Sequence, residues 1–122
     1  MQFSQLKILK GIENKMTINE YQKLALRTMN HHLSKKDILI NGVMGLCGES
    51  GEAIDIVKKH LAHGHELDRE HLIEELGDIA WYLAEAAYSL DIDLETIFKK
   101  NIEKLEKRYP DGFDKIRSYH NE

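Results

Sequence analysis

The chain contains few of the residues that mark several large classes of protein. It has one cysteine and one proline in 122 residues. One cysteine cannot form an internal disulfide, so a disulfide scaffold is excluded and a reducing compartment is favoured. The net charge of -4 is spread along the chain, which argues against a nucleic-acid-binding surface. No run of about 18 apolar residues and no secretory signal pattern is present. We therefore expect a cytoplasmic protein that binds neither nucleic acid nor membranes.

The single cysteine, Cys47, stands between Leu46 and Gly48 in an apolar segment. Free cysteine is one of the most frequently buried residues, and a thiol without nearby basic groups is unreactive. We expect Cys47 to be a buried, inert side chain.

The composition favours helices. The chain is 42% hydrophobic and 31% charged, as in ordinary globular proteins. Apolar residues recur with helical spacing. They predict an all-α protein, a four-helix-type bundle, with helices over residues 18–30, 34–60, 69–89 and 94–108. Residues 1–16 have a weaker pattern and are expected to be an N-terminal extension, which leaves residues 17–122 as the domain.

Several residues predict where these helices begin and end. Residues 17–20 form a capping box in which Thr17 and Glu20 satisfy free amides. Asp68 and Asp93 are expected N-caps of the third and fourth helices. Gly64 is the expected end of the second helix.

The second helix carries four glycines at every third position, Gly42, Gly45, Gly48 and Gly51. Each costs about 0.8–1 kcal/mol relative to alanine inside a helix. Close approach of a partner helix or a phosphate-bearing ligand is favoured at Gly48 and Gly51. At Gly42 and Gly45, a break between two shorter helices is an equally good explanation.

Two acidic pairs stand inside apolar helical segments, Glu49 with Glu52 and Glu75 with Asp78. Their i, i+3 spacing places both carboxylates of a pair on one helix face. If the two helices are antiparallel, the pairs face each other, with Gly77 beside the second pair. Carboxylates gathered in this way repel one another unless cations neutralise them. Oxygen ligands suit Mg²⁺, or Mn²⁺, so a magnesium site is predicted.

Other metal sites are less well supported. Glu103 and Glu106 have the same spacing but alternate with basic residues, which is typical of a solvated helix face. A zinc site would have to use adjacent histidines at 31 and 32 or those at 60, 63 and 65, with no cysteine nearby. No Glu-x-x-His sequence occurs, which argues against a di-iron bundle.

The stretch from Gly48 to Glu52, followed by the stretch from Glu74 to Asp78, resembles the E-x-x-E…E-x-x-D signature of the MazG-like nucleoside triphosphate pyrophosphohydrolases, a group that includes the all-α dCTP pyrophosphatases. The segment from Asn101 to Pro110 resembles the N-x-x-K-L-x-x-R-Y-P motif that closes that domain. The likeness covers residues 17–113.

The resemblance implies a Mg²⁺-dependent enzyme that cleaves a (d)NTP into a (d)NMP and pyrophosphate. It implies that the metal-ligating and catalytic residues are Glu49, Glu52, Glu75 and Asp78. Substrate-binding roles fall to Tyr82, Asn101, Lys104 and Arg108. Glu74 is a candidate for supporting the metal ligands without binding the metal itself. Gly48 stands where some members keep another glutamate, so the general base is unassigned. A homodimer or homotetramer is implied as well.

Two alternatives stay open. The same chemistry can act on dUTP, phosphoribosyl-ATP or an alarmone, because four ligand positions do not encode base specificity. The chain can also be a non-catalytic helical module that binds a metal or a partner protein.

Overall fold

The computed structural model describes residues 15–113, which form an all-α fold. The expected fold class is confirmed, and no strand occurs within the described part. Most of the expected N-terminal extension, residues 1–16, and the segment after Phe113 lie outside the described residues. The division into an extension and a domain is therefore still a prediction.

The first helix, α2 (Ile18–Ala25), is shorter than expected. Thr17 is its N-cap and accepts a hydrogen bond from the Glu20 amide at 3.1 Å, as the capping box predicts. After Ala25 the chain tightens into the 3₁₀ turn η1 (Leu26–Thr28) instead of continuing to residue 30. The Trp81 indole N–H donates to the Ala25 carbonyl at 2.9 Å, so α4 binds a carbonyl at the end of α2.

The second helix, α3, is continuous over Lys35–His63. Ser34 caps its start, and Gly64 closes it in the left-handed conformation with φ 69°. Its 29 residues span about 43 Å. The structure therefore excludes a break at Gly42 or Gly45.

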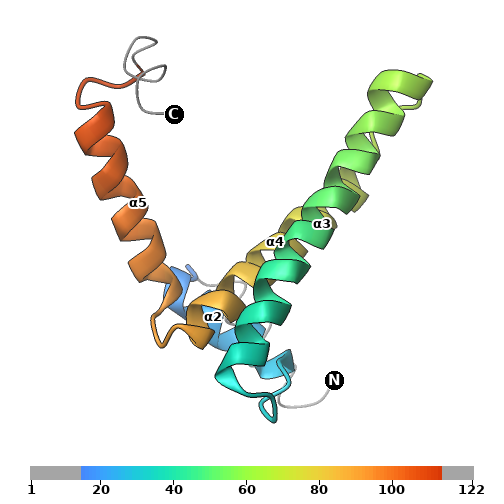
Figure 1. Ribbon diagram of the computed structural model, residues 1–122. Helices are drawn as coiled ribbons and strands as arrows, with labels where there is room; N and C mark the ends of the chain where they lie inside the picture. The colour runs from blue at the N-terminus through green and yellow to red at the C-terminus, as the bar shows by residue number, and fades with distance from the viewer. Residues whose placement is uncertain (1–14, 114–122) are drawn as a thin grey trace.

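The remaining helices begin where they were expected. Asp68 caps α4 (Arg69–Ser89), and Asp93 caps α5 (Leu94–Arg108). The helices α3 and α4 run side by side as an antiparallel hairpin (Figure 1). In contrast, α5 starts beside α2 and the end of α4 and then diverges from the hairpin, so that the ribbon forms a V (Figure 1).

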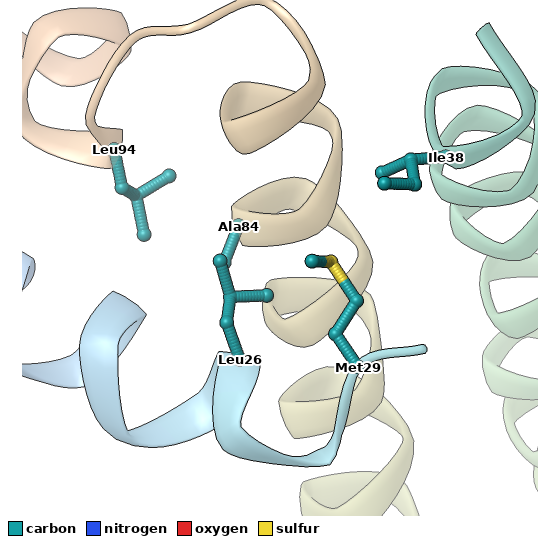
Figure 2. Packing of buried hydrophobic residues seen from close by; sticks show 5 residues of the cluster. All are labelled: Leu26, Met29, Ile38, Ala84 and Leu94. Atoms are coloured by element: carbon teal, nitrogen blue, oxygen red, sulfur yellow. The ribbon is translucent and has the colours of Figure 1, made fainter. Parts of the chain in front are cut away.

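The core lies at one end of this hairpin. Figure 2 shows five of its residues, which come from η1, the segment after it, α3, α4 and the start of α5: Leu26, Met29, Ile38, Ala84 and Leu94. Buried Gln22 joins these elements, since it donates to the Ala84 carbonyl and accepts from the Leu94 amide. The hydrophobic core cluster of the described residues therefore lies at this end.

The glycines of α3 divide into two kinds. A Cβ atom at Gly42 would lie 3.0 Å from the Ala86 backbone nitrogen, and one at Gly45 would lie 2.2 Å from the Tyr82 ring. Gly48 and Gly51 have no atom within 4 Å of such a position, and neither does Gly77 on α4. Close approach of a partner helix or a phosphate-bearing ligand was expected mainly at Gly48 and Gly51. For a helix within the described residues that expectation was wrong, and for a ligand it stays a prediction.

Many large apolar side chains of the predicted helices are exposed, because no helix within residues 15–113 covers them. They lie on the outer faces of all three long helices: Ile40, Val43, Met44, Ile54, Ile73, Leu76, Phe98, Ile102 and Leu105. Cys47 is also exposed, which overturns the expectation of a buried thiol. Among the described helices, none combines the length and apolar character that a membrane span requires.

Candidate metal centre

Three of the predicted acidic residues come together across the α3–α4 hairpin. Glu49 on α3 and Glu75 and Asp78 on α4 each offer one carboxylate oxygen, and these oxygens lie within 4.8 Å of one another. Antiparallel pairing of the two helices produces this arrangement, because it places Glu49 of the first pair opposite both members of the second. Glu49 and Glu75 are half-buried and Asp78 is exposed.

The electrostatics of this group fit a cation. A hydrogen bond shared with the Glu75 carboxyl group raises the pKa of Glu49, and partial burial and repulsion by Glu75 raise it further. With both carboxyl groups ionised, the buried Oε2 atom of Glu75 has no hydrogen-bond partner. Once both carboxyl groups are ionised, neither can donate a proton to the other. A divalent cation would pair the orphaned oxygen and neutralise the repulsion.

The two other acidic candidates lie outside this group. Glu52 is exposed and lines a neighbouring pocket of about 300 Å³, which also includes Asp55, Lys59 and His71. Glu74 is exposed on α4. The role of Glu52 as a metal ligand and that of Glu74 as a residue supporting the ligands stay predictions.

A second pocket, of about 410 Å³, opens directly beside the acidic group. Glu49, Asp78 and the predicted substrate-binding residue Tyr82 line it, together with Thr28 and Trp81. Trp81 and Tyr82 meet edge to face with their ring centroids 5.1 Å apart. The burial of the Tyr21 hydroxyl and the charge of Asp78 raise the pKa of Tyr21.

Thr28 and Trp81 were missed as site residues. The Trp81 indole N–H donates to the Thr28 hydroxyl at 3.0 Å and so fixes one wall of the pocket. The sequence signal was the adjacency of Trp81 to Tyr82, three residues after Asp78. Nothing in the sequence marks Thr28 as a site residue, because its position in the pocket depends on the 3₁₀ turn η1.

The remaining predicted substrate-binding residues are on α5. Asn101 and Lys104 are exposed and Arg108 is half-buried. None of the three lines the pocket beside the acidic group. Since α5 diverges from the hairpin (Figure 1), the single chain brings together the acids and Tyr82 but not the α5 residues.

The histidines do not form a comparable group. His60 meets the backbone carbonyl of His65 at 2.7 Å, and the His32 amide bonds the Asn30 side chain. The cluster of metal-ligand atoms within residues 15–113 contains no histidine.

The fold and site thus define an all-α protein in which three carboxylates, a candidate metal site, come together across a helical hairpin. The family model of the MazG nucleotide pyrophosphohydrolase domain matches residues 41–113, and the chain belongs to this family. This match includes every residue of the acidic group and all of α4 and α5.

A relative from Mycobacterium phage L5, named Gene 37 protein, is 41% identical over 73 residues. These residues make up 57% of this chain and 64% of the phage protein, so the match spans less than two thirds of that relative. No solved structure was found to match the chain.

Proposed function

We propose that this protein is a Mg²⁺-dependent nucleotide pyrophosphohydrolase that cleaves a (d)NTP into a (d)NMP and pyrophosphate. The observation that carries the proposal is the group formed by Glu49, Glu75 and Asp78, in which a buried carboxylate oxygen lacks a partner. Membership of the MazG family supplies the reaction class.

Glu49, Glu75 and Asp78 would hold the cation, and Glu52 would join them from the next turn of α3. Mg²⁺ ligated by a few carboxylates keeps open positions for substrate phosphates and water, and it neutralises charge that develops during phosphoryl transfer. Tyr82, Thr28 and Trp81 line the adjoining pocket, and we assign the nucleoside to it. The aromatic rings offer apolar surface, while the hydroxyl groups offer hydrogen bonds.

Phosphate binding would fall to Lys104 and Arg108, with Asn101 one turn earlier on the same helix. Cationic side chains bind phosphate oxygens through charge-assisted hydrogen bonds. These residues stand on the diverging helix α5, so a second copy of the chain is needed to supply them. We therefore propose a homodimer or homotetramer in which α5 of one copy completes the site of another.

The exposed apolar faces support such an assembly. Ile40, Val43 and Met44 on α3 and Ile102 and Leu105 on α5 are at least 40% exposed. On α3 these residues have i, i+3 and i+4 spacing and share one helix face, and exposed apolar faces commonly mark interfaces in soluble proteins. Ultracentrifugation that found only monomers at micromolar concentration would contradict the assembly.

The function is tested by measuring pyrophosphate release from a panel of nucleotides with Mg²⁺. The panel includes the four dNTPs, the four NTPs, dUTP, phosphoribosyl-ATP and an alarmone, so that it identifies both the activity and the substrate. We expect turnover by wild type and its loss in Glu52→Gln. Glu103→Gln, a residue with the same i, i+3 spacing on α5, is the matched control and should keep its activity. Full activity in Glu52→Gln would remove Glu52 from the site, and no turnover of any nucleotide would favour a non-catalytic module.

The contribution of α5 is tested by mixing two inactive variants. Glu75→Gln and Lys104→Ala each disable one half of a shared site. If α5 acts across the interface, mixed dimers contain one intact site and activity returns to about a quarter of the wild-type value, by random pairing of the two chains. If no activity returns after subunit exchange, α5 does not act in this way.

A further inference from the structure

His71 lies one turn before Glu75 on α4, and its side chain contacts the Glu75 carboxyl group. The His71 Nε2 atom is 3.2 Å from Oε1 of Glu75. The Glu75 side chain is only 13% exposed, whereas that of His71 is 48% exposed. His71 is therefore a partly exposed side chain in contact with a half-buried member of the acidic group. Its contact leaves Oε2 as the Glu75 oxygen without a protein partner.

The imidazole lies beside the N-cap of the helix. Asp68, the N-cap of α4, accepts a hydrogen bond from the His71 amide at 3.2 Å. Its other oxygen, Oδ2, lies 3.9 Å from the His71 Nδ1 atom. The spacing of Asp68, His71 and Glu75 is i, i+3 and i+7, so the three side chains share one face of the helix.

This geometry fixes the direction of the contact with Glu75. A carboxylate that ligates a metal is ionised and can only accept hydrogen bonds. The Nε2 atom of His71 must then donate to Oε1. A hydrogen bond on one oxygen limits rotation of the carboxylate about its terminal bond. It therefore favours one orientation of the second oxygen, Oε2.

We propose that His71 is a positioning residue that orients the Glu75 carboxylate for the divalent cation. It acts through Glu75 and not as a ligand, since the ligand atoms gathered within residues 15–113 include no histidine nitrogen. Groups that hydrogen-bond metal ligands typically change metal affinity or activity 10- to 100-fold when they are removed. The proposal rests on the proposed function only in assigning Glu75 to a metal site.

The test measures the affinity for Mn²⁺, without nucleotide, by electron paramagnetic resonance and calorimetry. We expect His71→Leu, which keeps the bulk but loses the donor, to bind Mn²⁺ about 10-fold or more weakly. His71→Gln should retain most of the affinity, because its amide nitrogen can donate to a carboxylate one helical turn away. His63→Leu, at an exposed histidine in the last turn of α3, is the matched control and should bind like wild type.

A second measurement uses turnover at increasing Mg²⁺ concentration. The His71→Leu enzyme should require more Mg²⁺ for half-maximal activity and recover most of its maximal rate when the metal saturates. Thermal unfolding of the metal-free variants checks the fold.

Four results would overturn the proposal: wild-type affinity in His71→Leu, equal losses in His71→Leu and His71→Gln, a His71→Leu variant that does not fold, or no divalent-cation binding by wild type. The last result would overturn the proposed function as well. Wild type can bind Mn²⁺, and the variants behave as expected, without any nucleotide being cleaved. In that case the proposed pyrophosphohydrolase function is wrong, but the proposed role of His71 is supported.

Discussion

The two halves of the α3–α4 hairpin differ in what surrounds them. Near Ile38 and Ala84 the hairpin is covered by α2, η1 and the start of α5, and the core is buried (Figure 2). Toward the turn that connects α3 to α4, the two helices project alone (Figure 1). Apolar side chains such as Ile54, at 61%, and Leu76, at 53%, are exposed there. The acidic group lies at the boundary between the covered half and the bare half.

The difference shows that the glycines repeated at every third position of α3 have two uses. In the covered half, Gly42 and Gly45 let the helices approach closely, and a side chain at either position would meet Ala86 or Tyr82. In the bare half, Gly48 and Gly51 leave open space beside the carboxylates. The first two glycines serve the packing of this chain, and the space at the other two is available to a ligand or a second copy.

The largest expected effect concerns the acidic group. Glu75→Gln removes a charge from the cation site, and we expect pyrophosphate release to fall on the order of 100-fold or more, as when other preorganised charge-stabilising groups are removed. The same change removes the repulsion with Glu49, so the metal-free variant should unfold at the same temperature as wild type or higher. Unchanged activity, or a marked loss of metal-free stability, would contradict the assignment.

The two kinds of glycine are compared directly by Gly45→Ala and Gly48→Ala. The first forces a methyl group against the Tyr82 ring, and we expect a loss of about 1–3 kcal/mol in unfolding free energy. The second adds a methyl group in open space and should stabilise the helix by up to about 0.8–1 kcal/mol. Urea denaturation measures both. A loss at Gly48→Ala would indicate that this position is covered in the assembled protein.

A smaller effect on stability and substrate binding is expected at Trp81, which lines the pocket and bonds the end of α2. Trp81→Phe keeps an aromatic ring but removes the N–H that bonds Ala25 and Thr28. We expect a loss of about 1 kcal/mol in unfolding free energy, the usual net value of one hydrogen bond. The Michaelis constant for the nucleotide should rise because Thr28 is no longer held. Thr28→Val, which also breaks the bond to Trp81, should raise the Michaelis constant as well.

The smallest expected effect is a pH dependence at Glu49. Its pKa in the folded protein is raised above the ordinary value of 4.5, so the folded state holds the proton more tightly than the unfolded state. The resulting stabilisation is complete below pH 4.5 and is lost as the pH rises through the raised pKa. Stabilisation by Mg²⁺ should therefore grow from pH 4.5 to pH 7, as thermal unfolding with and without the metal can show. In Glu49→Gln, stabilisation by Mg²⁺ should not increase between pH 4.5 and pH 7.

Much of the local structure was predictable because it depends on neighbouring residues. The N-caps at Thr17, Asp68 and Asp93 and the left-handed Gly64 mark helix boundaries that the structure reproduces. The antiparallel expectation placed Glu49 opposite Glu75 and Asp78, whereas Glu52 lies outside that group. These features depend on spacing and on short-range hydrogen bonds, which a sequence displays directly.

What was missed depends on contacts between distant residues. The early end of α2 follows from the indole of Trp81, which is 56 residues away. The exposure of Phe98 and Ile102 follows from the direction taken by α5, and helical periodicity identifies an apolar face without identifying what covers it. His71 carried a usable signal, since it precedes Glu75 by four residues.

The exposed thiol of Cys47 has a practical consequence. It is the only cysteine in the chain and stands on α3, two residues before Glu49 and at the edge of the bare half. A maleimide dye or a nitroxide spin label would therefore attach at one known place without any engineering. The natural sequence thus already provides a spectroscopic reporter beside the proposed metal centre and the surface proposed to meet a second copy.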